Sequence, residues 1–145
     1  MTRKIFTIVI LSFICLLSLQ VQAHAEGKAE IFHINKGKVI KKVPMNNVIH
    51  KETETIIQSV TDLYRELEPI PQKGYMVKIP LDPAIMVKNQ WMEDLVSEVI
   101  VIFPEYENPH LMVFNDENMP YFFRFNGSVD KLLTKLDLKF DGQRE

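Results

Sequence analysis

The sequence predicts an α+β domain that is built on a mostly antiparallel sheet. Three short apolar runs, at residues 99–103, 111–114 and 121–125, are rich in β-branched and aromatic side chains. Pro, Asn and Asp residues bound each run, which is typical of strands rather than helices. Because two loops of similar length separate the runs, we expect a central three-stranded antiparallel meander around which the other segments pack.

A pair of strands is predicted near the start of the domain. Residues 31–34 and 39–43 are largely apolar and flank a polar stretch that contains Gly37. Glycine readily adopts the positive φ that a tight connection between two strands requires. The pattern therefore predicts an N-terminal β-hairpin, whose second strand ends at Pro44.

One long helix is predicted next, capped by Asn46 or Asn47. Apolar side chains then recur at spacings of three and four residues, which is the period of an amphipathic helix. We expect this helix to continue to Glu68, because proline disfavours helical geometry in the residue before it and Pro69 follows. The predicted buried stripe consists of Ile49, Thr53, Ile56, Val60, Leu63 and Leu67.

Shorter elements are predicted between this helix and the meander. The stretch 75–81 alternates in polarity and predicts a strand, in which Pro80 indicates an edge position or an early end. A turn at Asp82-Pro83 and another short strand at 84–87 follow. Residues 90–96, with Trp91 and Leu95 at helical spacing, favour a short helix or a turn.

A short C-terminal helix completes the predicted fold, with Ser128 as its cap and Asp130 in its first turn. It is one candidate to cover the sheet. The strands of the meander are apolar on both alternating faces, whereas a sheet with one wet face alternates apolar with polar residues. Either the protein itself covers both faces, or one apolar face is available to a partner.

The N-terminal segment has the three regions of a secretory signal peptide. Arg3 and Lys4 precede an apolar run at residues 5–19, and Ala23 and Ala25 occupy the two positions that a signal peptidase reads. The run is shorter than the roughly 20 residues needed to span a bilayer. We expect cleavage after Ala25 and a secreted or extracytoplasmic protein; the alternative is a protein tethered to the membrane through the uncleaved segment.

Cleavage would leave residues 26–145 as a single small α+β domain. The only cysteine, Cys15, lies in the signal segment, so the mature chain would have no disulfide and no cysteine nucleophile. Without Arg3 and Lys4, 15 basic side chains remain against 19 acidic ones. Acidic and basic residues alternate along the chain, which disfavours a nucleic-acid partner because phosphate backbones require clustered Lys and Arg.

Sequence motifs for catalysis or metal binding are lacking. His33, His50 and His110 do not have the short spacings of metal ligands. The acidic loops 105–108 and 115–118 are expected at opposite ends of one strand, and neither has an EF-hand pattern. No serine lies in a Gly-x-Ser-x-Gly elbow, and five glycines leave no phosphate-binding loop. We expect no metal, no cofactor and, on balance, no enzyme.

The aromatic residues are the best candidates for contacts with a partner or a ligand. Tyr121, Phe123 and Phe125 share one face of a predicted strand, while Trp91 and Tyr106 lie near loop ends, where an amphipathic ring tolerates partial exposure. The competing interpretation is that the first three form the core of the sheet.

The predicted function is a small exported binding or interaction protein without catalysis, whose partner is unknown. Two alternatives stay open. A carrier of a small apolar ligand would require a closed apolar cavity beside residues 122–125. A hydrolase at the cell envelope would require that His33, His50 or His110 converge with carboxylates in a cleft.

Overall fold

The structure is a computed structural model, which describes residue 1 and residues 27–140. The predicted signal segment, with Ala23 and Ala25, therefore lies outside the described residues, apart from Met1.

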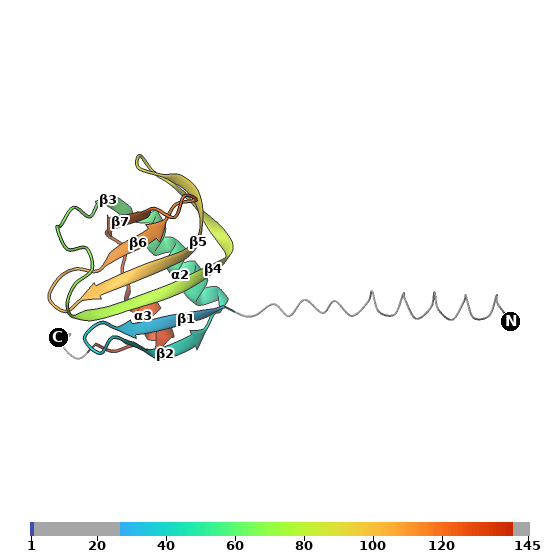
Figure 1. The fold of residues 1–145 in the computed structure, drawn as a ribbon, viewed down its shortest axis with the longest axis horizontal. Coiled ribbons are helices and arrows are strands. Elements are labelled where there is room, and N and C mark those ends of the chain that lie inside the picture. Colours follow the sequence, from blue (N-terminus) through green and yellow to red (C-terminus); the bar gives the residue numbers. More distant parts are fainter. Residues whose placement is uncertain (2–26, 141–145) are drawn as a thin grey trace.

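Seven strands form one antiparallel sheet in the order β2-β1-β4-β5-β6-β7-β3 (Figure 1). The prediction of a mostly antiparallel sheet is confirmed, and β5, β6 and β7 are sequential neighbours within it. Among residues 27–140, two helices, α2 (Asn47–Gln58) and α3 (Asp130–Leu136), complete the α+β fold. The strands are β1 (Lys28–His33), β2 (Lys38–Pro44), β3 (Val60–Leu63), β4 (Gly74–Lys88), β5 (Glu93–Pro104), β6 (His110–Phe114) and β7 (Pro120–Phe125).

Both helices lie on the same face of the sheet, which we call the inner face (Figure 1). One row of apolar side chains crosses six strands on this face, with each residue opposite the next in register. Five of the six are buried, and Leu63 packs against the same core. Burial of this row under the helices is the main source of stability. The row consists of Ile31, Val77, Val101, Leu111, Phe123 and Leu63.

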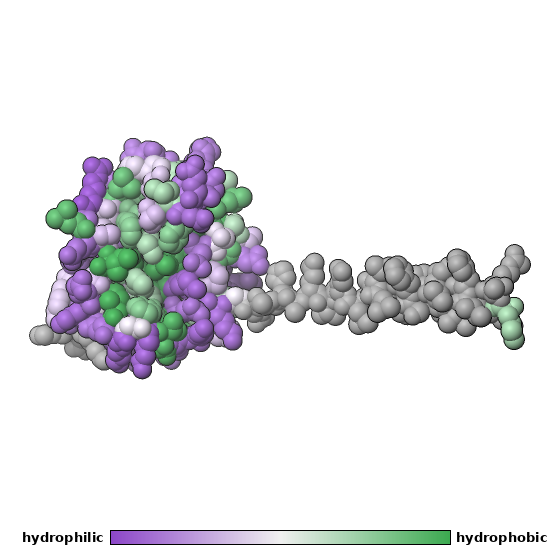
Figure 2. Space-filling view, in the orientation of Figure 1, coloured by the Kyte–Doolittle hydropathy of each residue, from purple (hydrophilic) through white to green (hydrophobic). Residues whose placement is uncertain are grey.

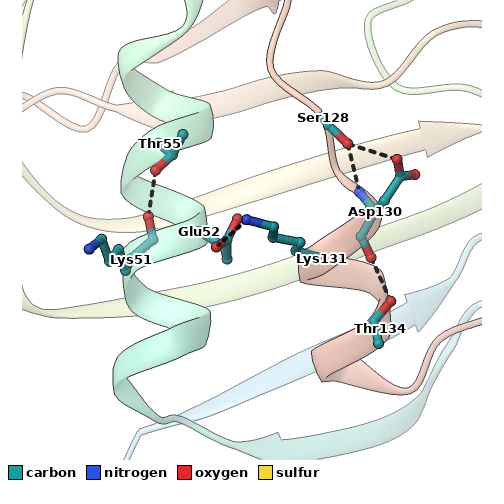
Figure 3. Close-up of polar contacts among 7 residues, drawn as sticks. All are labelled: Lys51, Glu52, Thr55, Ser128, Asp130, Lys131 and Thr134. Atoms are coloured by element: carbon teal, nitrogen blue, oxygen red, sulfur yellow. Dashed lines mark hydrogen bonds and ion pairs between the residues drawn. The ribbon is translucent and has the colours of Figure 1, made fainter.

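The two helices are side by side across the inner face, as Figure 3 shows from the helix side. The Asn46 side chain caps α2 by accepting hydrogen bonds from the backbone amides of Val48 and Ile49, both at 2.9 Å. At the surface of the helix pair, Lys131 Nζ lies 3.9 Å from Glu52 Oε1. In the core, α2 contributes Ile49, Thr53, Ile56 and Ile57, and α3 contributes Leu132, Leu133 and Leu136.

The prediction of one helix from residue 46 to Glu68 is wrong, because α2 ends at Gln58 and β3 follows at once. Ser59 caps the end of the helix, and its hydroxyl donates to the Ile56 carbonyl at 2.7 Å. The amide of Gly127 in turn donates to Ser59 Oγ at 2.9 Å. The segment after β7 therefore fixes the point at which the helix ends.

The prediction of a helix or turn at residues 90–96 is only partly right. The turn is limited to a few residues, where the Asn89 side chain accepts from the amides of Trp91 and Met92. β5 starts already at Glu93 and pairs with the end of β4. The two strands predicted at 75–81 and 84–87 are one long strand with an irregular register between Pro80 and Ile85.

Ser128 lies at the start of α3 as predicted, but it is not the capping residue. That position is Val129, which has no side-chain hydrogen bond to the helix. Ser128 Oγ instead accepts from the Asp130 amide at 3.2 Å and donates to the Asp130 carboxylate at 2.8 Å (Figure 3).

Candidate functional site

The face of the sheet opposite the helices, the outer face, has no second layer among the described residues. Figure 2 shows this face with a hydrophobic band that runs across the strands between hydrophilic margins. The register explains the band, because Phe32, Met76 and Ile102 are opposite one another, as are Ile100, Met112 and Phe122. We call these six residues the outer stripe.

The two central residues of the outer stripe are buried, whereas the four residues around them are partly exposed to solvent. Ile102 is fully buried, and Met112 is also buried. The remaining four residues are half-buried. Two more apolar side chains, Val39 and Phe114, are exposed on the strands beside the stripe. A continuous apolar surface with a packed centre is the usual form of a protein-binding patch.

An ion triplet limits the outer stripe at the β1–β2 end. The Glu30 carboxylate lies 2.6 Å from Lys42 Nζ and 3.2 Å from Lys78 Nζ, from the two neighbouring strands. The hydrogen bond from Lys42, followed by that from Lys78, lowers the pKa of Glu30. One carboxylate faces two ammonium groups, so this margin carries a net positive charge beside the stripe.

A stacked cluster limits the outer stripe at the opposite end. The Tyr64 ring lies on the His110 ring with 3.9 Å between centroids, and the Arg124 guanidinium lies 5.2 Å from the Tyr64 ring. Arg124 also pairs with Glu66 at 2.7 Å. Burial and the hydrogen bond that Tyr64 donates to Glu107 at 2.9 Å raise the pKa of Tyr64 to about 12. The phenol therefore stays protonated at neutral pH and acts as a donor.

His110 is the most buried ionisable side chain of this cluster, with 1% of its surface exposed. Its Nε2 lies 2.6 Å from the Pro69 carbonyl, so Nε2 carries the proton and donates it. Burial lowers the pKa of His110, although the carbonyls of Pro69 and Asn108 oppose this effect. A neutral, covered imidazole holds the 64–73 loop against the sheet, and its position does not suit proton exchange with a bound substrate.

The five predicted contact residues lie in different environments in the structure. Phe123 is buried in the inner face, where its ring lies 6.1 Å from Tyr121 and 5.9 Å from Trp91. Phe125 and Tyr121 are half-buried against the same core, so the shared face of this strand is the inner one. Only Tyr106 is largely exposed, at 86%.

Sequence reasoning missed the outer stripe as a site. The signal was present, since residues 99–103 and 111–114 are apolar on both alternating faces. Which face the helices would cover was not visible in that pattern. In the structure the uncovered face carries Phe122, whereas its predicted neighbour Phe123 is turned to the helices.

The three predicted histidines occupy separate elements of the fold. His33 ends β1, His50 lies in α2 and His110 starts β6. Within residues 27–140, no group of three His, Cys, Asp or Glu side chains could hold a metal ion. The loops 105–108 and 115–118 flank β6 at its two ends, as the antiparallel arrangement required.

No family model matches the chain, and no curated protein or solved structure matches it significantly either. In the part of the chain that the structure describes, no helix has the length and apolar character to cross a membrane.

Proposed function

We propose that the protein is a non-catalytic binding module that docks a partner protein on the outer face of its sheet. The outer stripe carries this proposal, because it is a continuous apolar surface on which the described residues place no helix and no second sheet. Sheets that are apolar on both faces are ordinarily covered on both. The partner supplies the missing layer.

The shape and chemistry of the outer face suit a flat apolar partner surface. Two packed sheets lie about 10 Å apart and interdigitate their side chains. Met76 and Met112 have flexible thioether side chains, which adapt to an irregular partner. Each half-buried residue of the stripe would contribute on the order of 1 kcal/mol when covered.

The two charged margins would form the polar rim of the interface. Glu30 with Lys42 and Lys78 lies at one end, and Arg124 with Glu66 lies at the other. These exposed pairs contribute little to affinity, but they set the orientation of the partner and the salt dependence of association.

The place of action follows from the N-terminal segment, and it is part of the proposal. A chain with this leader acts outside the cytoplasmic membrane, either free or tethered through the uncleaved segment. The binding reaction requires no cofactor or metal.

The two alternative functions, an apolar-ligand carrier and a hydrolase, have weaker support at the positions that the sequence predicted for them. The hollow beside Phe125 is open and is lined mainly by polar side chains, among them Glu66 and Arg124. This is a poor site for the apolar-ligand carrier. A hydrolase would use His110 with Glu107, but the imidazole is covered by Tyr64 and bonded to Pro69.

The test is affinity capture by the tagged full chain from the envelope and medium of the producing cell, read by mass spectrometry. Phe122→Asp places a charge in the outer stripe, and Val48→Asp places the same charge on an exposed apolar position of α2. We expect a stoichiometric partner that the wild type and Val48→Asp retain. Phe122→Asp should weaken it at least about 30-fold, as loss of an interface hot spot does.

Circular dichroism of both variants shows whether the fold is retained. A partner that binds folded Phe122→Asp as tightly as the wild type would refute the outer face as the docking surface. Partner loss in Tyr106→Ala or Trp91→Ala alone would place the interface at the originally predicted loop positions.

A further inference from the structure

A second site lies on the inner face and is independent of the proposed function, although it shares Glu107 with the Tyr64 cluster at the margin of the outer stripe. It is a cavity of about 320 Å³ at the end of the sheet where β1 and β5 end and β4 begins. Two residues that flank α3 in the chain form its roof, Val129 before the helix and Phe140 after it. The volume lies at the lower end of the range for small-molecule sites, about 300–1,000 Å³.

Four rings in mutual contact form one side of the cavity, and we call them the aromatic wall. His33 lies 4.7 Å from Tyr75 between ring centroids. Phe140 lies 4.9 Å from Tyr75 and 4.9 Å from Phe103. The rings are tilted against each other by 37° to 53°, so the wall is not a closed stack. Such an array offers both an apolar surface and the negative faces of several rings.

The backbone around the cavity is held firmly in place. The Gly74 amide donates to Asn35 Oδ1 at 3.1 Å, and the Ile34 amide donates to the Gly74 carbonyl at 3.0 Å. Gly74 has a φ of +127°, and a side chain there would meet the Phe103 carbonyl at 2.1 Å. Glycine at this position is thus what allows the first residue of β4 and the end of β5 to approach so closely.

The roof is anchored through the end of α3. Asp137 adopts a left-handed conformation with a φ of +47°, which turns the chain back towards the cavity. Lys41 Nζ donates to both the carbonyl and the carboxylate of Asp137 at 2.8 Å. Phe140 therefore covers the cavity from a segment that is tied to β2.

The charges around the cavity have one sign. Glu105 and Glu107 line it, and no lysine or arginine is among its described lining residues. Each carboxylate has a tyrosine neighbour, since Tyr64 donates to Glu107 at 2.9 Å and Tyr106 bonds to Glu105. One phenol uses only part of the acceptor capacity of a carboxylate, so both groups can still accept bonds from a ligand.

We propose that this cavity binds a small organic cation, an ammonium group on an apolar or aromatic body. The ammonium lies at Glu105 and Glu107, and the body lies against the aromatic wall. An anion would face two carboxylates, with no lysine or arginine among the described lining residues to compensate them. A neutral ligand would gain the contact with the aromatic wall but would leave both carboxylates without a positive partner. A metal ion is not favoured, because no described cluster supplies three ligands.

The test compares three probes with nearly the same phenyl body and different charge: phenethylammonium, 2-phenylethanol and 3-phenylpropionate. Binding to the purified full chain is followed by titration in ¹H–¹⁵N NMR, with the shifts of residues 33–35, 74–75 and 103–107 as the local reporters. We expect affinity to fall in the order cation, neutral, anion. Phenylpropionate binding as tightly as phenethylammonium would overturn the proposal, as would the absence of local shifts with all three probes at millimolar concentration.

Two variants and one control test which residues contribute to the binding of the probes. Glu105→Gln/Glu107→Gln keeps the acceptors for the tyrosines and removes both charges, so phenethylammonium should bind about fivefold more weakly while 2-phenylethanol is unaffected. Phe140→Ala opens the roof and should weaken both probes. Glu117→Gln, in the loop between β6 and β7, should leave both unchanged. Wild-type affinity for phenethylammonium in the double variant would refute the role of the carboxylates, even if the outer face still binds its protein partner.

Discussion

The two faces of the sheet are built from the same kinds of residue and end in different states. Phe122 and Phe123 are consecutive in β7, yet one belongs to the outer stripe and the other lies in the core under the helices. On the inner face, α2 and α3 exclude water from a full row of apolar side chains. On the outer face, a similar row is bordered by ion pairs and left open. The difference shows that hydrophobic content determines which residues form strands, while the docking of the helices determines which face is free for a partner.

The largest expected effect comes from truncating the two neighbouring phenylalanines. Phe123→Ala leaves a cavity in a closed core and should lower the free energy of unfolding by about 3–5 kcal/mol. Phe122→Ala removes a half-buried ring from the open face and should lower it by about 1–2 kcal/mol. Urea denaturation of both variants measures the difference. Equal losses would mean that the outer face is closed in the free protein.

The next largest effect is the pH dependence of stability that His110 causes at the polar end of the outer stripe. Burial lowers the pKa of His110 in the folded protein, so the unfolded chain binds a proton first as the pH falls below about 6.5. Stability is complete above this pH. It is lost as the pH falls towards the folded pKa, by at most about 1.4 kcal/mol per pH unit. Urea denaturation at a series of pH values between about 7.5 and about 5 measures this slope.

Two histidine variants identify the group responsible for that slope. His110→Gln retains an amide donor for the Pro69 carbonyl and should flatten the dependence of unfolding free energy on pH. His50→Gln, in α2, is the matched control variant. If His110→Gln behaved like the wild type, another group would have to explain the acid sensitivity.

A smaller loss of stability is expected from removal of the N-cap of α2, the helix that begins at Asn47 and covers the inner face. Asn46→Ala removes the side chain that accepts two amide bonds at the start of α2 and should cost about 1 kcal/mol. Asn47→Ala, one residue further along, serves as the matched control and should be near neutral. Thermal unfolding of the two variants measures the contribution of the cap. Partner binding at the outer face should be unchanged in both, because the cap lies on the opposite side.

The smallest effect is expected at the ion triplet. The pKa of Glu30 is lowered by Lys42 and Lys78, so its contribution is present above the unfolded pKa of a glutamate and is lost as the pH falls through the folded value. Glu30→Gln should therefore reduce the loss of stability in acid, and added salt should diminish the difference from the wild type. Glu68→Gln, in an exposed loop, is the control. A difference that is independent of salt would point to packing rather than charge.

Local patterns predicted those parts of the fold whose boundaries are set locally. The strands β6 and β7 and the second half of β5 are short apolar runs that turn residues follow, and no distant contact is needed to recognise them. The end of α2 was missed because the apolar spacing continues into β3 through Val60 and Leu63. What ends the helix is a contact with distant residues, since the Asn126 amide donates to the Ser59 carbonyl at 3.1 Å.

The candidate sites depended even more on tertiary structure. Phe32 and Met76 meet on the outer face because β1 pairs with β4, although β2, α2 and β3 lie between them in the chain. The aromatic wall likewise joins residues from both ends of the domain, such as His33 and Phe140. The sequence indicated that one face could stay open and that aromatic residues mattered, but it could not show which of them would be exposed.

The path of the chain through α2 links the two edges of the sheet. β2 forms one edge and β3 the other, and the helix between them crosses the inner face with only a few residues at either end. Neither edge strand can leave the sheet without pulling the helix from the core, so fraying at one edge is resisted by packing that also serves the other. We therefore expect the amide protons of β2 and β3 to exchange through a common, global opening of the domain rather than through separate local ones.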